Sequence, residues 1–209
     1  MSLTIVITKT PRQIGTLFFS AAYYLLLAAG VLALVYAGAV VMESHRYQAI
    51  EQARFVSRSP AATPAIPVEG SVLGRLEIPR LGMAVIIDEG VSDNILRRAV
   101  GHIPQTALPG ERGNIALAGH RDTFFRPLRK IQAGDAIALK TPTGNSEYRV
   151  ESTAVVAPTD IQVLKPSRDR MLTLVTCFPF SFLGSAPDRF IVRARLVSYS
   201  PPGALPSPP

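Results

Sequence analysis

The hydrophobic pattern divides the chain into one long uncharged run near the N-terminus and a later region of short runs. No charged residue occurs in residues 17–42. At about 1.5 Å per residue, a helix of this length exceeds the roughly 30 Å hydrocarbon core of a bilayer. Tyr23 and Tyr36 lie toward its opposite ends, as is typical of residues at a membrane interface. The pattern predicts a transmembrane helix over residues 17–42, after a cytoplasmic N-terminus at residues 1–16.

We interpret this helix as a retained anchor. The segment Ala37–Ala39 has the A-x-A shape of a cleavage site, but the apolar run is longer than the roughly 7–15 residues of a signal-peptide core. Basic residues flank the helix on both sides: Lys9, Arg12, Arg46, Arg54 and Arg58. The charges alone therefore leave the orientation open. We expect the usual single-anchor arrangement, with the short N-terminus inside the cell and the larger region outside.

Two proline-rich stretches bound the remaining region. Residues 43–70 begin as a polar, helix-permissive stalk and continue through Pro60, Pro64 and Pro67, which is typical of a semi-rigid linker. Residues 201–209 are also rich in proline, and we expect a disordered tail there. Residues 71–200 are left as one domain of ordinary size.

Short β-favouring runs dominate residues 71–200. They are Val72–Ile78, Ala84–Asp88, Asn114–Ala118, Ala136–Lys140, Tyr148–Ala157, Met171–Cys177 and Phe190–Val197. Helical turns are predicted only at Ser92–Arg98, with Ser92 as N-cap, and at Thr123–Arg129. Many short strands with few helices favour a mainly β fold, either a closed barrel or a sandwich.

Alternation within the last two runs separates core positions from outward positions. The even-numbered residues from Phe190 to Leu196 are apolar and predict a core face. The opposite face carries Arg189, Arg193 and Arg195. In the preceding run, Cys177 is the last residue before the turn-forming Phe178-Pro179, so its thiol is predicted at a strand end. A strand end is both rigid and accessible.

Composition excludes several classes of protein. The chain is 47% hydrophobic and 18% charged, which excludes a disordered or fibrous chain. The net charge is +7, but the arginines are scattered and no nucleic-acid-binding motif is present, so we expect no nucleic-acid partner. One cysteine and three well-separated histidines exclude an internal disulfide and a multi-cysteine metal site. We expect no metal and no cofactor.

The single cysteine is the candidate for chemistry. As a buried apolar thiol Cys177 would be inert, but outside the cytoplasm an unpaired thiol invites oxidation, which favours a use for it. A nucleophilic thiol needs a base. Of His45, His102 and His120, we prefer His120 because it follows a predicted strand through Gly119. Arg189 opens the last strand, where a hairpin would bring its guanidinium beside Cys177 as an oxyanion donor.

Three segments carry a family resemblance. The segment TLVTC at 173–177 resembles the TLxTC signature of sortases. LAGHR at 117–121 resembles the segment that holds the sortase histidine, and DRFIVRA at 188–194 resembles the strand that opens with the sortase arginine. The longer runs GHRDTFFRPL and TLVTCFPF are most similar to class D sortases.

The resemblance implies a fold and a site. It implies a closed eight-stranded β-barrel, for which Asp160–Leu164 is our candidate for the eighth strand. It implies that Cys177 is the nucleophile, His120 the general acid and base, and Arg189 the residue that stabilises the oxyanion. The acidic residues that bind calcium in some sortases have no assignable counterpart here.

The resemblance also implies partners. The substrates would be secreted proteins that end in an LPxT-like sorting signal. They would be cleaved through a thioacyl-enzyme and transferred to an amine of a wall precursor or a pilin lysine.

Two alternatives remain open. An L,D-transpeptidase would share the compartment and a β-rich fold, but its cysteine usually follows an S-x-G sequence, whereas Cys177 follows Leu174-Val175-Thr176. A catalytically inactive extracytoplasmic barrel that only binds a partner is the second alternative.

Overall fold

The structure is a computed structural model of the chain, and it describes residues 11–57, 67–181 and 184–201. Most of the predicted proline-rich linker and tail, and most of the segment before the predicted transmembrane helix, lie outside the described residues. The described chain divides into two compact units, at Met1–Glu43 and Ser44–Pro209.

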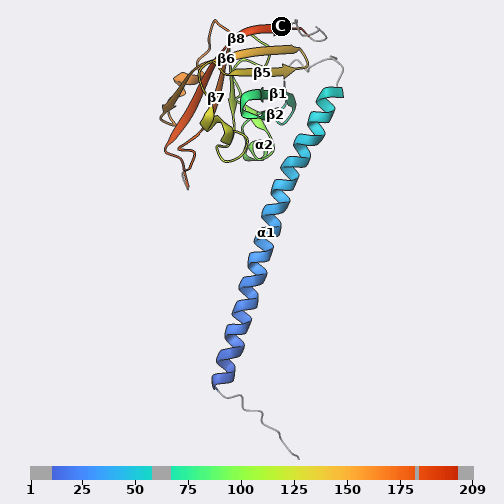
Figure 1. Ribbon diagram of the computed structural model, residues 1–209, viewed down its shortest axis with the longest axis vertical. Coiled ribbons are helices and arrows are strands. Elements are labelled where there is room, and N and C mark those ends of the chain that lie inside the picture. The colour runs from blue at the N-terminus through green and yellow to red at the C-terminus, as the bar shows by residue number, and fades with distance from the viewer. Residues whose placement is uncertain (1–10, 58–66, 182–183, 202–209) are drawn as a thin grey trace, which may run out of the picture. The chain divides into compact units, whose positions relative to one another are not determined.

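Helix α1, Pro11–Ser57, contains the uncharged run (Figure 1). Its apolar side chains between Phe19 and Met42 are largely exposed, and Leu34 is 75% exposed. By length and composition this helix could cross a membrane. An uncharged run without proline allows the helix to form, and the exposed apolar surface would be stabilised by lipid.

The larger unit is a closed β-barrel. Its strands are β1 Val72–Ile78, β2 Met83–Glu89, β3 Val100–His102, β4 Asn114–Ala118, β5 Ala136–Thr141, β6 Gly144–Val156, β7 Met171–Phe178 and β8 Asp188–Ser200. Their order around the barrel is β1-β2-β3-β4-β7-β8-β6-β5, and β5 pairs with β1 to close it. The pairs β2–β3 and β4–β7 are parallel, and the other pairs are antiparallel. The fold class predicted from the sequence is confirmed.

The core fills the inside of the barrel from alternating positions on the strands. Along β5 every second residue is buried, as the period of a strand requires. On β8 the predicted core face is confirmed, because Val192 and Ala194 are buried in the core cluster with Phe190 and Leu196 packed against it. Ile191, on the opposite face, is also buried.

The eighth strand is not where the sequence predicted it. Residues Ile161–Leu164 form the 3₁₀ helix η3, and the Asp160 carboxylate accepts a hydrogen bond from the backbone N–H of Gln162 at its start. This side-chain bond stabilises a helical turn instead of an extended run. The eighth strand is the three-residue β3, which follows helix α2, Asp93–Leu96.

The remaining short helices partly match the prediction. Ser92 is the N-cap residue of α2, although its side chain makes no capping hydrogen bond. The predicted turn at Thr123–Arg129 is the 3₁₀ helix η2, Arg126–Lys130. A further 3₁₀ helix, η1 at Pro79–Leu81, joins β1 to β2.

The last turns of α1 belong to the barrel unit and contact β2 and Arg98, which follows helix α2. The Tyr47 hydroxyl donates to the Asp88 carboxylate at 2.8 Å, and the Arg98 guanidinium lies 4.7 Å from the Tyr47 ring centre. Gln48 donates to the Arg98 carbonyl and accepts from the Ile86 N–H. Burial raises the pKa of Asp88, while the hydrogen bond from Tyr47 and the charge of Arg98 act in the opposite direction.

Candidate functional site

Cys177 lies near the end of β7 and is a half-buried free thiol. The antiparallel register places it directly opposite Arg189 on β8. Directly opposite residues of an antiparallel pair point to the same face of the sheet, about 4.5–5.5 Å apart. The thiol and the guanidinium therefore share one face at one end of the barrel.

Arg189 is held by its own loop. Its Nη1 donates to the carbonyl of Asp188 at 3.0 Å and to that of Ala186 at 3.4 Å. These two bonds use one nitrogen, while a guanidinium carries five N–H donors. The side chain therefore has donors to spare for a ligand beside Cys177.

His120 reaches the same end of the barrel from the other side of β7. Strands β4 and β7 are parallel with Ala118 opposite Val175, and two further residues along each chain lead to His120 and Cys177. The Thr176 hydroxyl donates to the Gly119 carbonyl at 2.7 Å, which fixes the chain just before His120 against the chain just before Cys177. The imidazole is half-buried and makes no hydrogen bond with another side chain in the described part of the molecule.

The other two histidines lie elsewhere. His102 is 1% exposed, and its ring nitrogens contact Glu89 on one side and the Ala107 carbonyl and the Thr106 hydroxyl on the other. Both nitrogens are thus occupied, which makes His102 a structural residue of the barrel. His45 is exposed on α1. Of the three histidines, the structure brings His120 to the strand end that holds Cys177.

Three aromatic side chains at this end were not singled out from the sequence as part of the site. Phe178, Phe180 and Phe190 form a cluster with ring centres 5.2–6.2 Å apart. Phe178 and Phe190 directly follow Cys177 and Arg189, and successive residues of a strand point to opposite faces, so their rings lie at the level of the thiol but on the core side of the sheet. In the sequence, the two phenylalanines of Phe178-Pro179-Phe180 could have indicated an aromatic cluster after Cys177. That Phe190 belongs to this cluster follows only from the pairing of β7 with β8.

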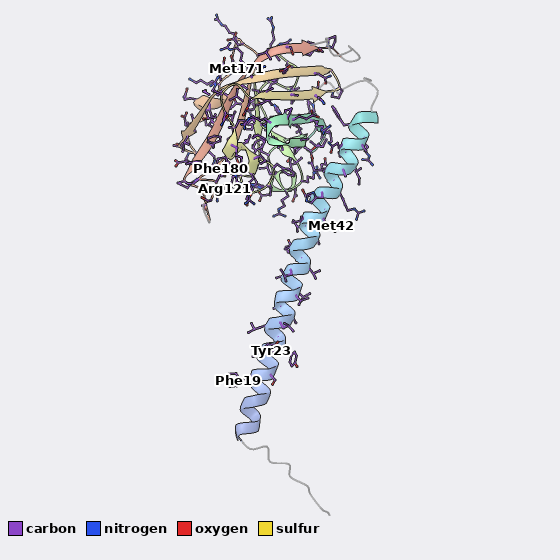
Figure 2. All side chains as sticks on the ribbon, viewed as in Figure 1. Phe19, Tyr23, Met42, Arg121, Met171 and Phe180 are labelled. Carbon is purple, nitrogen blue, oxygen red and sulfur yellow. The ribbon has the colours of Figure 1, made fainter. Side chains whose placement is uncertain are left out.

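Arg121 links the two loops of the site. Its Nη2 donates to the Gly184 carbonyl at 3.0 Å, which ties the segment after His120 to the loop between β7 and β8. Figure 2 shows Arg121 and Phe180 at one end of the barrel and Met171, the first residue of β7, at the other. Among the described residues, no group of three or more His, Cys, Asp or Glu side chains is arranged to hold a metal ion.

Comparisons with known proteins agree with this architecture. The family model "Sortase domain" matches residues 76–197. Sortase D of Bacillus subtilis (strain 168) is 35% identical over 133 residues, which cover 63% of this chain and 67% of that protein. The chain belongs to the sortase family, whose members are cysteine transpeptidases.

Solved structures show the same likeness. The Clostridium perfringens Sortase D5 transpeptidase superposes with a TM-score of 0.57 at 30% identity, covering 75% of this chain and 93% of that one. The SrtF sortase from Corynebacterium diphtheriae superposes with a TM-score of 0.64 at 26% identity, covering 72% and 97%. Class D sortases are thus among the relatives in both sequence and structure.

Proposed function

We propose that the chain is a membrane-anchored transpeptidase in which Cys177, His120 and Arg189 perform the chemistry. The observation that carries this proposal is the register of three adjacent strands. Strand β7 carries Cys177 opposite Arg189 on β8, and the β4–β7 pairing leads His120 to the same level. A thiol, an imidazole and a guanidinium at one rigid strand end are the groups that acyl transfer requires.

The proposed reaction has two acyl transfers. The Cys177 sulfur attacks the scissile carbonyl carbon of a sorting signal, the C–N bond breaks, and protonated His120 gives its proton to the leaving amine. A thioester between Cys177 and the substrate results. An incoming amine then attacks the thioester, His120 takes the amine proton, and the cysteine leaves as a thiolate. Arg189 donates hydrogen bonds to the oxyanion of each tetrahedral intermediate, where charge develops.

The proposed substrate is a secreted protein with an LPxT-like C-terminal signal, and the acceptor is an amine of a wall precursor or a pilin lysine. The family membership supports a peptide substrate and an amine acceptor, and the signal itself comes from the sequence resemblance.

We place the barrel outside the cell, anchored by α1. The length and uncharged surface of the helix support the anchor. A membrane-impermeant maleimide added to intact cells tests the orientation cleanly, because Cys177 is the single cysteine of the chain. Labelling in intact cells places the barrel outside. Labelling that requires lysis would contradict the proposed orientation.

The reaction is tested with the full chain in neutral detergent and a quenched fluorescent LPxT-type peptide plus an amine. The chain is expected to produce the amine-linked product, and Cys177→Ala is expected to produce none. Mass spectrometry should find the acyl adduct on Cys177, released by hydroxylamine as a thioester. Full turnover by Cys177→Ala would overturn the proposal. A parallel reaction with peptidoglycan stem peptides tests the L,D-transpeptidase alternative.

A further inference from the structure

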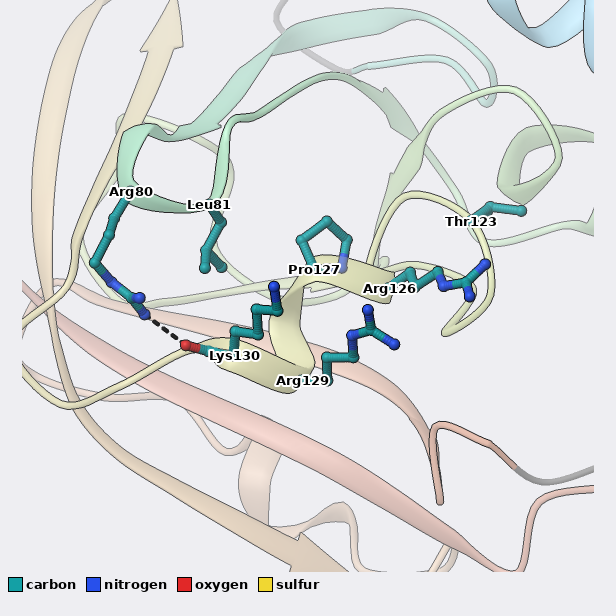
Figure 3. Close-up of a pocket in the computed structure, with 7 residues that line it drawn as sticks. All are labelled: Arg80, Leu81, Thr123, Arg126, Pro127, Arg129 and Lys130. Carbon is teal, nitrogen blue, oxygen red and sulfur yellow. Dashed lines mark hydrogen bonds between the residues drawn. The ribbon is translucent and has the colours of Figure 1, made fainter.

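A basic pocket outside the candidate site has no role in the proposed reaction. It is a hollow of about 510 Å³ at the junction of η1 and η2, and Arg80, Leu81, Arg126, Pro127, Arg129 and Lys130 contribute to its lining (Figure 3). None of these residues takes part in acyl transfer as proposed above. Four of them carry a positive charge, and none of the residues that line the pocket carries a negative charge.

One wall of this basic pocket is fixed by its own ion pair. The Arg80 guanidinium donates two hydrogen bonds to the Asp135 carboxylate. It also donates to the Lys130 carbonyl, as Figure 3 shows. The carboxylate compensates the charge of Arg80. Arg80 therefore fastens η1 to the end of η2 and is not a free cation.

The other cations are uncompensated. Arg126, Arg129 and Lys130 are exposed, and no carboxylate in the described part of the chain forms a salt bridge with them. In a 3₁₀ helix the side chains at i and i+3 eclipse each other, so Arg126 and Arg129 are stacked on one side of η2, as Figure 3 shows. Like charges at this spacing repel each other, and a bound anion would remove that repulsion.

The helix that presents these charges is rigid. Phe125 and Leu128 are fully buried in the barrel core, so they anchor η2 from below while its basic residues face outward. Pro127 fixes one backbone angle inside the helix. The backbone that carries the cations is thus fixed before a ligand arrives, which lowers the entropic cost of binding.

We propose that this pocket binds a phosphate-bearing group with two or more negative charges, such as a diphosphate. Guanidinium forks bind phosphate oxygens bidentately, and Lys130 adds a point charge at the end of the same helix. A single carboxylate would leave most of the charge uncompensated. A free or lipid-linked diphosphate and the two phosphodiesters of a diphosphatidylglycerol headgroup are two sources of this chemistry.

The pocket is also connected to the candidate site through the backbone. The Phe125 N–H donates to the His120 carbonyl at 3.1 Å, so η2 begins where the loop that carries His120 ends. Binding at the pocket nevertheless needs no reaction at Cys177. It can be measured in the Cys177→Ala chain, and its outcome is independent of the proposed transpeptidase activity.

The test is isothermal titration calorimetry on the full-length Cys177→Ala chain in a neutral detergent. The probes are inorganic pyrophosphate, bis(glycerophospho)glycerol as the soluble headgroup of diphosphatidylglycerol, and citrate as a polycarboxylate. Saturable binding of pyrophosphate or bis(glycerophospho)glycerol, tighter than that of citrate, is expected, and the tighter of the two identifies the source. No saturable binding of either phosphate compound, or equal binding of citrate, would overturn the proposal.

A charge-matched pair of variants separates the pocket from net charge. Arg126→Gln with Arg129→Gln should weaken phosphate binding by about tenfold or more, since it removes two charge-assisted contacts. Arg112→Gln with Arg168→Gln removes the same charge from exposed positions outside the pocket and should leave binding within about twofold. Equal weakening by both pairs would show a diffuse charge effect and would contradict a built site. Thermal unfolding of each variant checks that the barrel is intact.

Discussion

At the scale of single residues, Arg189 is the sharpest test of the proposed chemistry. Arg189→Lys keeps the positive charge but loses the planar fork, whereas Arg189→Ala loses both. We expect kcat/KM to fall by about 10² or more in Arg189→Ala, with most of the loss in kcat, because the proposed contact forms with the oxyanion. Arg189→Lys should recover only part of it.

The control for this prediction is a second arginine of the same strand. Arg193 lies on the same face of β8, deeper in the strand and opposite Thr173. Arg193→Ala should leave kcat within about threefold, since the residue lies away from the strand end. Equal losses in the two alanine variants would point to a general effect of charge on β8 and would contradict the assigned role.

Thr176 is expected to act as a positioning residue. Its buried hydroxyl holds the Gly119 carbonyl at 2.7 Å, next to His120. Thr176→Val keeps the shape but leaves a buried carbonyl without this donor, so the free energy of unfolding should fall by about 1–3 kcal/mol. The pH profile of kcat should also change, because His120 loses a constraint on its placement, whereas the exposed Thr153→Val should change neither quantity. An unchanged profile in Thr176→Val would make the threonine purely structural.

At the scale of elements, the sequence predicted the long strands well. Of the seven β-favouring runs, those of β1 and β4 have the predicted bounds, and the other five differ from the strands only at their ends. These runs are apolar, alternate clearly and are bounded by turn residues, so local pattern alone determines them. The same periodicity predicted that Cys177 and Arg189 lie at strand ends. These are two of the three residues of the candidate site.

The elements that the sequence missed depend on contacts between distant segments. Strand β3 has three residues and contains Gly101, where an added Cβ would lie 2.2 Å from the Gly90 carbonyl oxygen. A strand of three residues is too short to show an alternating hydrophobic pattern, and the close approach of two backbones leaves no such pattern in the sequence. Residues Ile161–Leu164 were predicted as a strand but form a 3₁₀ helix, because the capping bond of Asp160 outweighs the β-propensity of isoleucine and valine. The Phe190 contacts are likewise set by strand pairing.

The last turns of α1 supply a prediction about one element. Tyr47 donates to the fully buried Asp88, so Tyr47→Phe leaves that carboxylate with one fewer hydrogen bond. We expect faster backbone hydrogen exchange over residues 44–57, because their attachment to β2 is weakened. Tyr36→Phe, at a tyrosine that is 69% exposed on the same helix, is the control and should not change this exchange. Unchanged exchange in Tyr47→Phe would mean that Gln48 and the Tyr47 ring are sufficient for the attachment.

At the scale of the whole molecule, acid stability should depend on Asp135. The hydrogen bonds from Arg80 hold the pKa of this carboxyl below its usual range. A lowered pKa means that the charged carboxylate stabilises the folded chain above its unfolded pKa of about 3.9, and that this stability is lost as pH falls through the folded value. Asp135→Asn should therefore lower the thermal midpoint at neutral pH, and the difference from the parent chain should shrink in acid.

Asp169→Asn is the control for this pH dependence. Asp169 pairs with Arg195, but its side chain is 62% exposed, and surface pairs of this kind contribute little to stability. Its thermal midpoint should follow that of the parent chain from neutral pH into acid. A difference between Asp135→Asn and the parent chain that stays constant through the acid range would contradict the assigned ion pair.

The place of β8 in the barrel has a consequence for how the chain matures. Strand β8 follows the other seven strands in the chain but lies between β7 and β6, so the barrel stays open along that seam until residues 188–200 are delivered. Until then, no guanidinium lies opposite the thiol. A chain in which β8 has not yet joined the barrel therefore lacks one of the three groups proposed for acyl transfer. The proposed activity would thus begin only once the last strand of the chain is in place.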